Sequence, residues 1–255
     1  MFRFFLFVVL ACFTAVSASG RPDTLYVSVA GNGFGAVTKN AVGVWWPAVK
    51  APAKSKDGKS QNMAKAEVVV WFHGGMSSGN CQKGLVAGDD FAKLYPNVIV
   101  VSASACRTDH WATEKMMAAV DAALDSVAAR RGSPVQDVSL VGVSDGALGA
   151  IVYSAQGKRR VKDRLLASSF GKILGDAPAV ANAGPKMRDG RWRFLQGGND
   201  RLFPSAQSKP WIEGFCKEVR ADCMLRFDPA GEHDWSYWRE KHPDWIREAF
   251  LLPTP

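Results

Sequence analysis

The sequence predicts an α/β fold, with a mostly parallel central sheet covered by helices on both faces. Two patterns predict it: short apolar runs typical of buried strands, and amphipathic segments of helical period between them. The composition agrees, since 47% hydrophobic and 22% charged residues over 255 positions are typical of a globular chain and exclude disorder. We expect one domain, from about Ser19 to Pro255.

Eight segments are predicted as strands. The first two are short and flank a glycine-rich turn at Gly31–Gly35, and a Lys-, Ser- and Pro-rich stretch, Ala51–Lys65, follows them as an exposed loop. The later runs are continuous and apolar, as expected for strands buried on both faces, although Phe170–Gly175 is weaker than the rest. The expected strands are Leu25–Ser28, Val42–Trp46, Glu67–Phe72, Asn97–Ala103, Asp137–Val143, Phe170–Gly175, Arg191–Gln196 and Met224–Asp228.

Four segments are predicted as helices, because their apolar residues recur at helical spacing. The last of them contains Pro243, which interrupts it. Strands that alternate with helices favour parallel pairing, because each crossover helix returns the chain to the same edge of the sheet. The expected helices are Glu114–Arg130, Gly146–Gln156, Ser205–Val219 and Trp235–Leu251.

The first eighteen residues have the pattern of a secretory signal peptide. Arg3 precedes an apolar stretch, and small residues end the segment at Ala18. The apolar stretch from Phe4 to Val16 has 13 residues, short of the ~20 that span a bilayer. We therefore expect residues 1–18 to be removed and the protein to be secreted or periplasmic. A minority alternative is a lipid anchor at Cys12.

Export changes the interpretation of the cysteines. Without Cys12, four of the five remain, an even number that favours disulfides in an oxidising compartment. Cys216 and Cys223 could close a local loop, and Cys81 and Cys106 each follow a strand end, but three pairings stay open. No cysteine or histidine cluster has the spacing of a zinc site, so we expect no metal.

Gly142-Val143-Ser144-Asp145-Gly146 is the sharpest chemical signal in the chain. This G-x-S-x-G follows an expected strand and opens an expected helix, the context in which a serine projects above the sheet as a nucleophile. The flanking glycines allow the strand and the helix to approach closely. Ser144 is therefore the candidate nucleophile.

A nucleophilic serine needs a base and a carboxylate, and both follow it on loops after later strands. His233 follows the strand Met224–Asp228, and Asp200 follows the strand Arg191–Gln196. The order serine, acid, base is the one expected for such a sheet. Asp176 is the alternative acid, whereas Asp234 is interpreted as solvated or as a helix cap.

Acyl transfer also needs donors for the developing oxyanion. His73-Gly74-Gly75-Met76 follows an early strand and can offer a backbone N–H, from Gly75 or Met76, which the sequence leaves open. The second donor is expected to be the N–H of Asp145, the residue after the nucleophile. His73 is interpreted as ordering this loop.

Aromatic and polar residues near these loops are candidates for substrate binding. His110 and Trp111 follow the strand Asn97–Ala103, and Trp235 follows the base. Trp238, three residues further on, has the spacing of a buried helix face.

These motifs resemble the α/β-hydrolase superfamily, within its secreted serine esterase branch. Gly231–Arg239 resembles the G-x-H-x-W-x-x-W-R stretch of enterochelin-type esterases, feruloyl esterases and mycolyltransferases, in which the histidine is the base. Polyhydroxybutyrate depolymerases share the serine turn and the His-Gly-Gly sequence but less of the aromatic segment Gly231–Arg239. The resemblance covers about Val68 to Trp245 and implies an α/β-hydrolase fold.

The expected function is that of an exported serine carboxylesterase without a cofactor, acting on a small-molecule or polymeric ester. An acyltransferase of the same fold and a non-catalytic binding module are the alternatives. The net charge of +8 suggests a nucleic-acid partner, but no nucleic-acid-binding motif accompanies it. We interpret the charge as surface character, with peripheral association with an anionic envelope as one consequence; the oligomeric state stays open.

Overall fold

An eight-stranded sheet forms the centre of the computed structural model, which describes residues 22–30, 37–47, 65–75, 78–106 and 109–250. The expected signal peptide, Cys12, the turn at Gly31–Gly35, nearly all of Ala51–Lys65 and Met76 lie outside these residues. The strands are β1 (Asp23–Ala30), β2 (Val37–Trp45), β3 (Val68–Phe72), β4 (Ile99–Ala103), β5 (Asp137–Val143), β6 (Arg160–Ala167), β7 (Arg191–Gly197) and β8 (Asp222–Asp228).

The order across the sheet is β1-β2-β4-β3-β5-β6-β7-β8. β1 and β2 pair antiparallel with each other, β2 pairs antiparallel with β4, and all later pairs are parallel. From β3 the chain moves outward to β4, and from β5 it moves outward in the other direction to β6. The crevice at the carboxyl ends of β3 and β5 is therefore a topological switch point, where open α/β sheets bind ligands.

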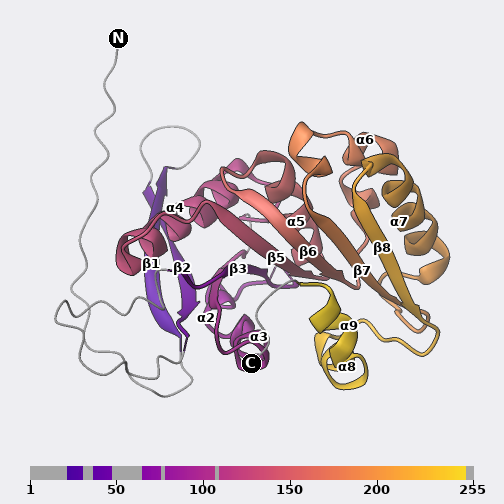
Figure 1. The fold of residues 1–255 in the computed structure, drawn as a ribbon, viewed down its shortest axis with the longest axis horizontal. Helices are drawn as coiled ribbons and strands as arrows, with labels where there is room; N and C mark the ends of the chain where they lie inside the picture. Colours follow the sequence, from indigo (N-terminus) through magenta and orange to yellow (C-terminus); the bar gives the residue numbers. More distant parts are fainter. Residues whose placement is uncertain (1–21, 31–36, 48–64, 76–77, 107–108, 251–255) are drawn as a thin grey trace, which may run out of the picture.

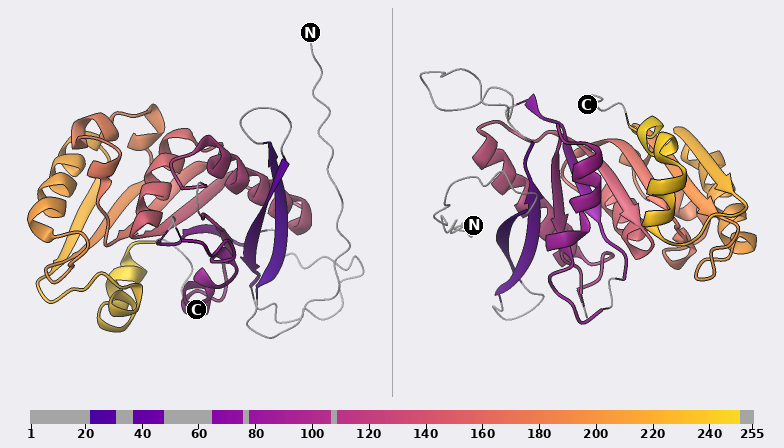
Figure 2. Two further views of the ribbon diagram at one scale, coloured as in Figure 1. Left: turned by 180° about the vertical axis from the view of Figure 1, so that it is seen from behind. Right: turned by 90° about the horizontal axis from the view of Figure 1, so that it is seen from below.

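Helices cover both faces of the sheet, as the sequence predicts (Figures 1 and 2). One face carries α4, α5, α6 and α7, and the opposite face carries α2, α3, α8 and α9 (Figure 1). The helices are α2 (Gly84–Ala87), α3 (Asp89–Leu94), α4 (Glu114–Arg131), α5 (Asp145–Gln156), α6 (Ala177–Ala181), α7 (Ser205–Val219), α8 (Trp235–Lys241) and α9 (Pro243–Glu248), with short 3₁₀ turns at Gly171–Ile173 and Pro185–Arg188.

The alternation of side chains along β3 shows how the two faces are filled. Val68, Val70 and Phe72 pack in the core beneath α4 and α5, whereas Val69 and Trp71 pack in a second core with residues of α3, α8 and α9. Successive side chains of a strand point to opposite faces, so a strand buried on both faces must be apolar throughout.

One expected strand is wrong. Phe170–Gly175 contains a 3₁₀ turn, and the strand in that part of the sheet is β6. Its sequence, RVKDRLLA, hides the pattern because charged residues occupy buried positions. Arg164 is fully buried, yet its guanidinium donates to Ser154 Oγ at 2.7 Å and to the carbonyl oxygens of Asp189 and Lys186. A buried cation is tolerated there because its N–H groups are satisfied.

Two disulfides join the four cysteines of the described chain, Cys81 to Cys106 and Cys216 to Cys223. The second is the local loop that the sequence suggested, and it links the last turn of α7 to β8. The first ties the segment before α2 to the segment after β4, at the edge of the sheet where β3 and β5 end.

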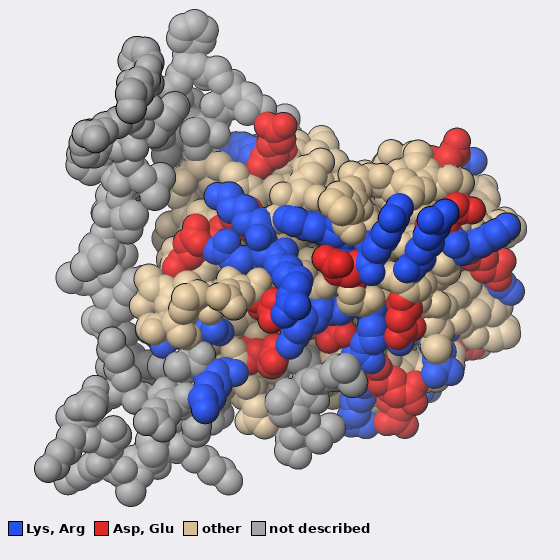
Figure 3. Space-filling model, turned by 45° about the horizontal axis from the view of Figure 1, so that its top comes forward, with Lys and Arg blue, Asp and Glu red and all other residues tan. Residues whose placement is uncertain are grey.

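Charged side chains of both signs lie together on the surface. Figure 3 shows Lys and Arg side chains across one face, with Asp and Glu between them. Ion pairs join many of the charged side chains of the described residues, among them Arg160 with Asp137 and Arg193 with Asp222. Within the part of the chain that the structure describes, no helix is long and apolar enough to cross a bilayer.

Candidate active site

Ser144 lies on a strained turn between β5 and α5. Its backbone has φ 56° and ψ −125°, a left-handed conformation that is uncommon for a residue with a side chain. The flanking glycines make the turn possible. A β-carbon on Gly146 would overlap the carbonyl oxygen of Phe72, and one on Gly142 would lie 2.6 Å from the α-carbon of Ala147. The turn thus presents the Ser144 hydroxyl at the carboxyl end of the central strand.

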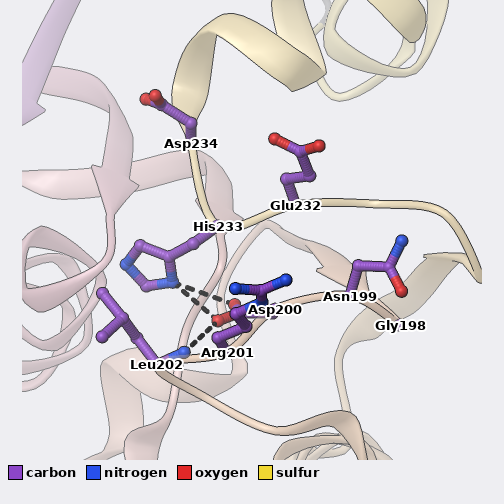
Figure 4. A pocket seen from close by; sticks show the side chains of 8 residues that line it. All are labelled: Gly198, Asn199, Asp200, Arg201, Leu202, Glu232, His233 and Asp234. Atoms are coloured by element: carbon purple, nitrogen blue, oxygen red, sulfur yellow. Dashed lines mark hydrogen bonds and ion pairs between the residues drawn. The ribbon is translucent and has the colours of Figure 1, made fainter.

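His233 joins the other two expected residues into one hydrogen-bonded chain. Its Nε2 lies 2.8 Å from Ser144 Oγ, and its Nδ1 lies 2.9 and 3.0 Å from the two carboxylate oxygens of Asp200. A carboxylate can only accept, so Nδ1 carries the proton and Nε2 is left to accept from the serine hydroxyl. Figure 4 shows the imidazole directed at the Asp200 carboxylate.

The Asp200 carboxylate is buried and well supplied with donors. Burial by itself would raise its pKa, but hydrogen bonds from His233, from the N–H of Phe203 and from Gln196 outweigh it and hold the pKa of Asp200 below its usual value. The distances are 2.8 Å from the Phe203 N–H and 3.2 Å from Gln196 Nε2. Asp200 is thereby kept ionised beside the imidazole.

The loops that carry Asp200 and His233 touch each other through glycines. Gly197 and Gly231 lie backbone to backbone, and the N–H of Asn199 donates to the Gly231 carbonyl at 2.9 Å. The aromatic residues that follow His233 support the loop that carries it. Trp238 is fully buried, as its spacing predicts, and its indole N–H donates to Ser168 Oγ at 3.1 Å.

His73 orders the loop after β3. A carbonyl only accepts, so Nδ1–H donates to Gly74 O at 2.9 Å, and Nε2 accepts the N–H of Ala105 at 3.0 Å. Burial lowers the pKa of His73 to about 4, which keeps the ring neutral, as this pair of hydrogen bonds requires. A β-carbon on Gly74 would lie 3.1 Å from Ser144 Cβ, so this loop lies directly against the nucleophile.

The structure describes two of the three expected oxyanion donors, and each follows in sequence a residue at the nucleophile: Gly75 follows Gly74, and Asp145 follows Ser144. Gly75 is the next residue along this loop and has φ +65°. Asp145 is the first residue of α5, and the N–H groups of a first helical turn point out of the helix end. Met76, the alternative to Gly75, lies outside the described residues.

A pocket of about 650 Å³ opens beside Asp200 and His233, and Ser144 is not among its lining residues. It is bounded by the acid and base loops, from which Leu202 presents a largely exposed side chain, 68% accessible. The lining residues are Gly198, Asn199, Asp200, Arg201, Leu202, Glu232, His233 and Asp234 (Figure 4).

The three expected substrate-binding residues do not line this pocket. Trp111 is fully buried against Phe72, and its indole N–H donates to His73 O at 2.9 Å, so it supports the loop from within the core and has no surface to offer a substrate. His110 is exposed in the turn before α4. Trp235 is nearly buried and packs edge-on against Trp71 at 4.8 Å between ring centroids.

His233 Nδ1 pairs with Asp200 and not with Asp176, the alternative acid. Asp176 precedes α6 and Asp234 precedes α8, each at the N-cap position without a side-chain capping bond. His242 is likewise separate from the triad, since its Nε2 pairs with Asp228 at 2.6 Å.

Two polar residues at the site were not predicted. Gln196 is buried at the end of β7, where its amide donates to both Asp200 and the carbonyl of Phe203. Ser168, with φ 51°, follows the last residue of β6, and its Oγ accepts the indole N–H of Trp238. Gln196 could have been found from the sequence, because it is a polar residue at the end of an apolar run, four positions before the acid. No comparable signal marks Ser168. Across the described segments, no group of three or more His, Cys, Asp or Glu side chains could hold a metal ion.

Comparison with known proteins places the fold. No protein-family model matches the chain, and no curated protein matches its sequence. Solved structures do. Esterase 2 of Thermogutta terrifontis has 13% identity and a TM-score of 0.61, over 91% of this chain and 97% of that one. A ferulic acid esterase has 15% identity and a TM-score of 0.60, over 89% of this chain and 99% of that one.

Other matches are longer proteins. A thermostable esterase has 12% identity and a TM-score of 0.60 over 89% of this chain, which spans 61% of that esterase. The chain spans 40% of the acylaminoacyl peptidase of Pyrococcus horikoshii, at 12% identity and a TM-score of 0.54 over 90% of this chain. The chain has the α/β-hydrolase fold.

Proposed function

We propose that the protein is a serine hydrolase that cleaves carboxylic esters through a covalent acyl-enzyme. The observation that carries the proposal is the hydrogen-bonded chain from Ser144 through His233 to Asp200 at the carboxyl edge of the sheet. A serine hydroxyl is a weak nucleophile until a base takes its proton, and an imidazole needs a carboxylate to fix its tautomer. Both conditions are met within hydrogen-bond distance.

In the first half-reaction, Ser144 Oγ attacks the ester carbonyl carbon while His233 Nε2 takes the hydroxyl proton. A bond forms between Oγ and the carbonyl carbon, and the carbonyl oxygen becomes an oxyanion. When the tetrahedral intermediate collapses, the carbon–alkoxy bond breaks and His233 returns the proton to the departing alcohol. The buried Asp200 carboxylate stabilises the imidazolium in between.

In the second half-reaction, water replaces the alcohol. His233 takes a proton from the water as the water oxygen bonds to the acyl carbon. When this tetrahedral intermediate collapses, the Ser144 Oγ–carbon bond breaks, His233 returns the proton to Ser144 Oγ, and a carboxylic acid is released. The backbone N–H of Asp145 and that of Gly75 or Met76 are the proposed donors to the oxyanion in both halves.

The choice of esters rests on the resemblance of Gly231–Arg239 to secreted esterases and on the esterases among the structural neighbours. Acylaminoacyl peptidases share the fold as well, so an amide substrate must be tested beside the esters. Acyl transfer to an alcohol differs only in what attacks the acyl-enzyme, and it is tested by adding acceptor alcohols.

The test is turnover of p-nitrophenyl acetate, butyrate and octanoate, methyl ferulate, polyhydroxybutyrate and an acetyl-amino-acid anilide by the wild type and by Ser144→Ala. We expect hydrolysis of at least one ester by the wild type and none by a folded Ser144→Ala. Equal activity in the two proteins, or hydrolysis of the anilide alone, would contradict the proposal.

We also propose that the protein is exported, with residues 1–18 removed. Two disulfides are compatible with an oxidising compartment. Expression in a bacterial host, followed by N-terminal sequencing of the periplasmic fraction, is expected to give a chain that begins at Ser19. A chain retained in the cytoplasm with Met1 intact would contradict export, and a membrane-bound chain that begins at a lipidated Cys12 would support the anchor instead.

A further inference from the structure

Lys83 lies behind the loop that faces the nucleophile. Its Nζ donates to two successive carbonyl oxygens of this loop, that of Gly74 at 3.3 Å and that of Gly75 at 3.1 Å. The ammonium is so close that a β-carbon on Gly75 would lie 2.5 Å from it. Lys83 comes directly before α2, and nothing in its sequence context marks it as part of the site.

Each of these carbonyls also accepts a second hydrogen bond. Gly74 O accepts from His73 Nδ1 at 2.9 Å, and Gly75 O accepts from the N–H of Ser78 at 3.2 Å. Both oxygens are therefore held on the side of the loop where Lys83 lies.

Peptide geometry turns this anchoring into an orientation of the N–H groups. The carbonyl of Gly74 and the N–H of Gly75 belong to one planar trans unit, in which C=O and N–H point in opposite directions. Holding the oxygen toward Lys83 thus directs the Gly75 N–H to the other side of the loop. Gly74, the residue before that N–H, packs against Ser144, with its β-position 3.7 Å from Ser144 Oγ.

The backbone on both sides of Lys83 is held in place. Cys81, two residues earlier, is bonded to Cys106 after β4. The N–H of Gly84, the next residue, donates to Ser104 Oγ at 2.9 Å, and a β-carbon on Gly84 would lie 2.5 Å from the carbonyl oxygen of Ser102. The short segment that carries Lys83 is therefore held on both sides. The Lys83 side chain itself is half-buried.

We propose that Lys83 is a positioning residue of the oxyanion site. It orients and polarises the Gly75 N–H through the Gly74 carbonyl, which belongs to the same peptide unit. This inference rests on the proposed function. A cation at the carbonyl end of a peptide unit draws electron density toward the oxygen, which makes the N–H at the other end a stronger donor. The benefit is largest when negative charge develops on the substrate oxygen, so it appears in the transition state and not in substrate binding.

The experiment compares Lys83→Met with the wild type in two assays, the rate of Ser144 labelling by a fluorophosphonate and the turnover of the best ester found in the panel. Met has the length of the lysine stem without its donors. Removal of a direct oxyanion donor costs 10²- to 10³-fold in kcat, so loss of the group that orients one is expected to cost about tenfold. We expect labelling and kcat to fall together by about tenfold, with KM changed less than threefold.

Two further variants complete the design. Lys93→Met removes a lysine of α3 that is paired with Asp89 away from the site, and we expect it to behave as the wild type. Lys83→Gln keeps a neutral donor of shorter reach and is expected to lose kcat by a smaller factor; it replaces Lys83→Met if the latter does not fold.

The outcomes separate the two proposals. A folded Lys83→Met or Lys83→Gln that labels and turns over as fast as the wild type would overturn the role of Lys83, and so would a change confined to KM. A folded wild type that neither labels nor hydrolyses any ester would overturn the proposed function itself.

Discussion

Gly231 packs against Gly197 so closely that a β-carbon on Gly231 would lie 2.7 Å from the α-carbon of Gly197. The loop of the acid and the loop of the base thus meet without any side chain between them. This contact brings together two loops from neighbouring parallel strands, β7 and β8, and so sets the distance between Asp200 and His233.

We therefore predict that Gly197→Ala impairs catalysis from outside the triad. A β-carbon on Gly197 would overlap the carbonyl oxygen of Gly231, so the loops must separate. A displacement of about 1 Å can cost on the order of 10²-fold, and we expect kcat to fall at least tenfold. Gly79→Ala is the matched control, since a β-carbon there meets nothing within 4 Å. Steady-state kinetics with equal losses in both variants, or in neither, would speak against the contact.

Asp200→Asn tests the acid. The amide cannot balance the charge of the imidazolium and favours the wrong tautomer, and a loss on the order of 10⁴-fold in kcat follows if Asp200 has this role. Asp176→Asn is the control, because that residue lies at the start of α6. Urea denaturation checks that each variant is folded, and we expect Asp200→Asn to unfold at the lower urea midpoint, because Asp200 is buried and accepts several hydrogen bonds. If Asp176→Asn were the inactive one, the assignment of the acid would be wrong.

The neutral, buried His73 makes stability depend on pH. Its pKa is about 4 in the folded protein against 6.5 for an unperturbed histidine. Between these values the unfolded chain binds the extra proton, so stability is fully present above pH 6.5 and is lost as the pH falls toward 4. We expect a contribution of up to about 3 kcal/mol to the free energy of unfolding, measured by urea denaturation at several pH values. His73→Gln should show a shallower dependence; an identical slope in both proteins would contradict the low pKa.

Loss of the disulfide between Cys81 and Cys106 should affect both stability and rate. It closes a separation of 25 residues, so Cys81→Ser/Cys106→Ser is expected to lose about 3 kcal/mol of stability. The pair Cys216 and Cys223, separated by 7 residues, is the control, and its removal should cost less stability and leave kcat of the folded protein unchanged. If kcat of the folded Cys81→Ser/Cys106→Ser protein stayed at the wild-type value, the disulfide would have no part in holding Lys83.

The strand ends and the order of Ser144, Asp200 and His233 could be predicted because each follows an apolar run of the right period. β6 could not, since Arg164 at a buried position breaks that pattern and is satisfied only by tertiary contacts. Trp111 was expected at a substrate site because it follows a strand at the edge of the sheet where the triad lies. Its position in the sequence does not determine the direction of its side chain, which points into the core. Lys83 Nζ donates to the carbonyls of Gly74 and Gly75, nine and eight positions earlier in the chain, a contact that composition and spacing do not predict.

The nucleophilic role of Ser144 is tested most directly by mass spectrometry of the intact protein after reaction with a fluorophosphonate, followed by mapping of the modified peptide. We expect one adduct per folded chain, located on Ser144 and absent from Ser144→Ala. A folded wild type that stays unmodified, or an adduct that persists in Ser144→Ala, would contradict it.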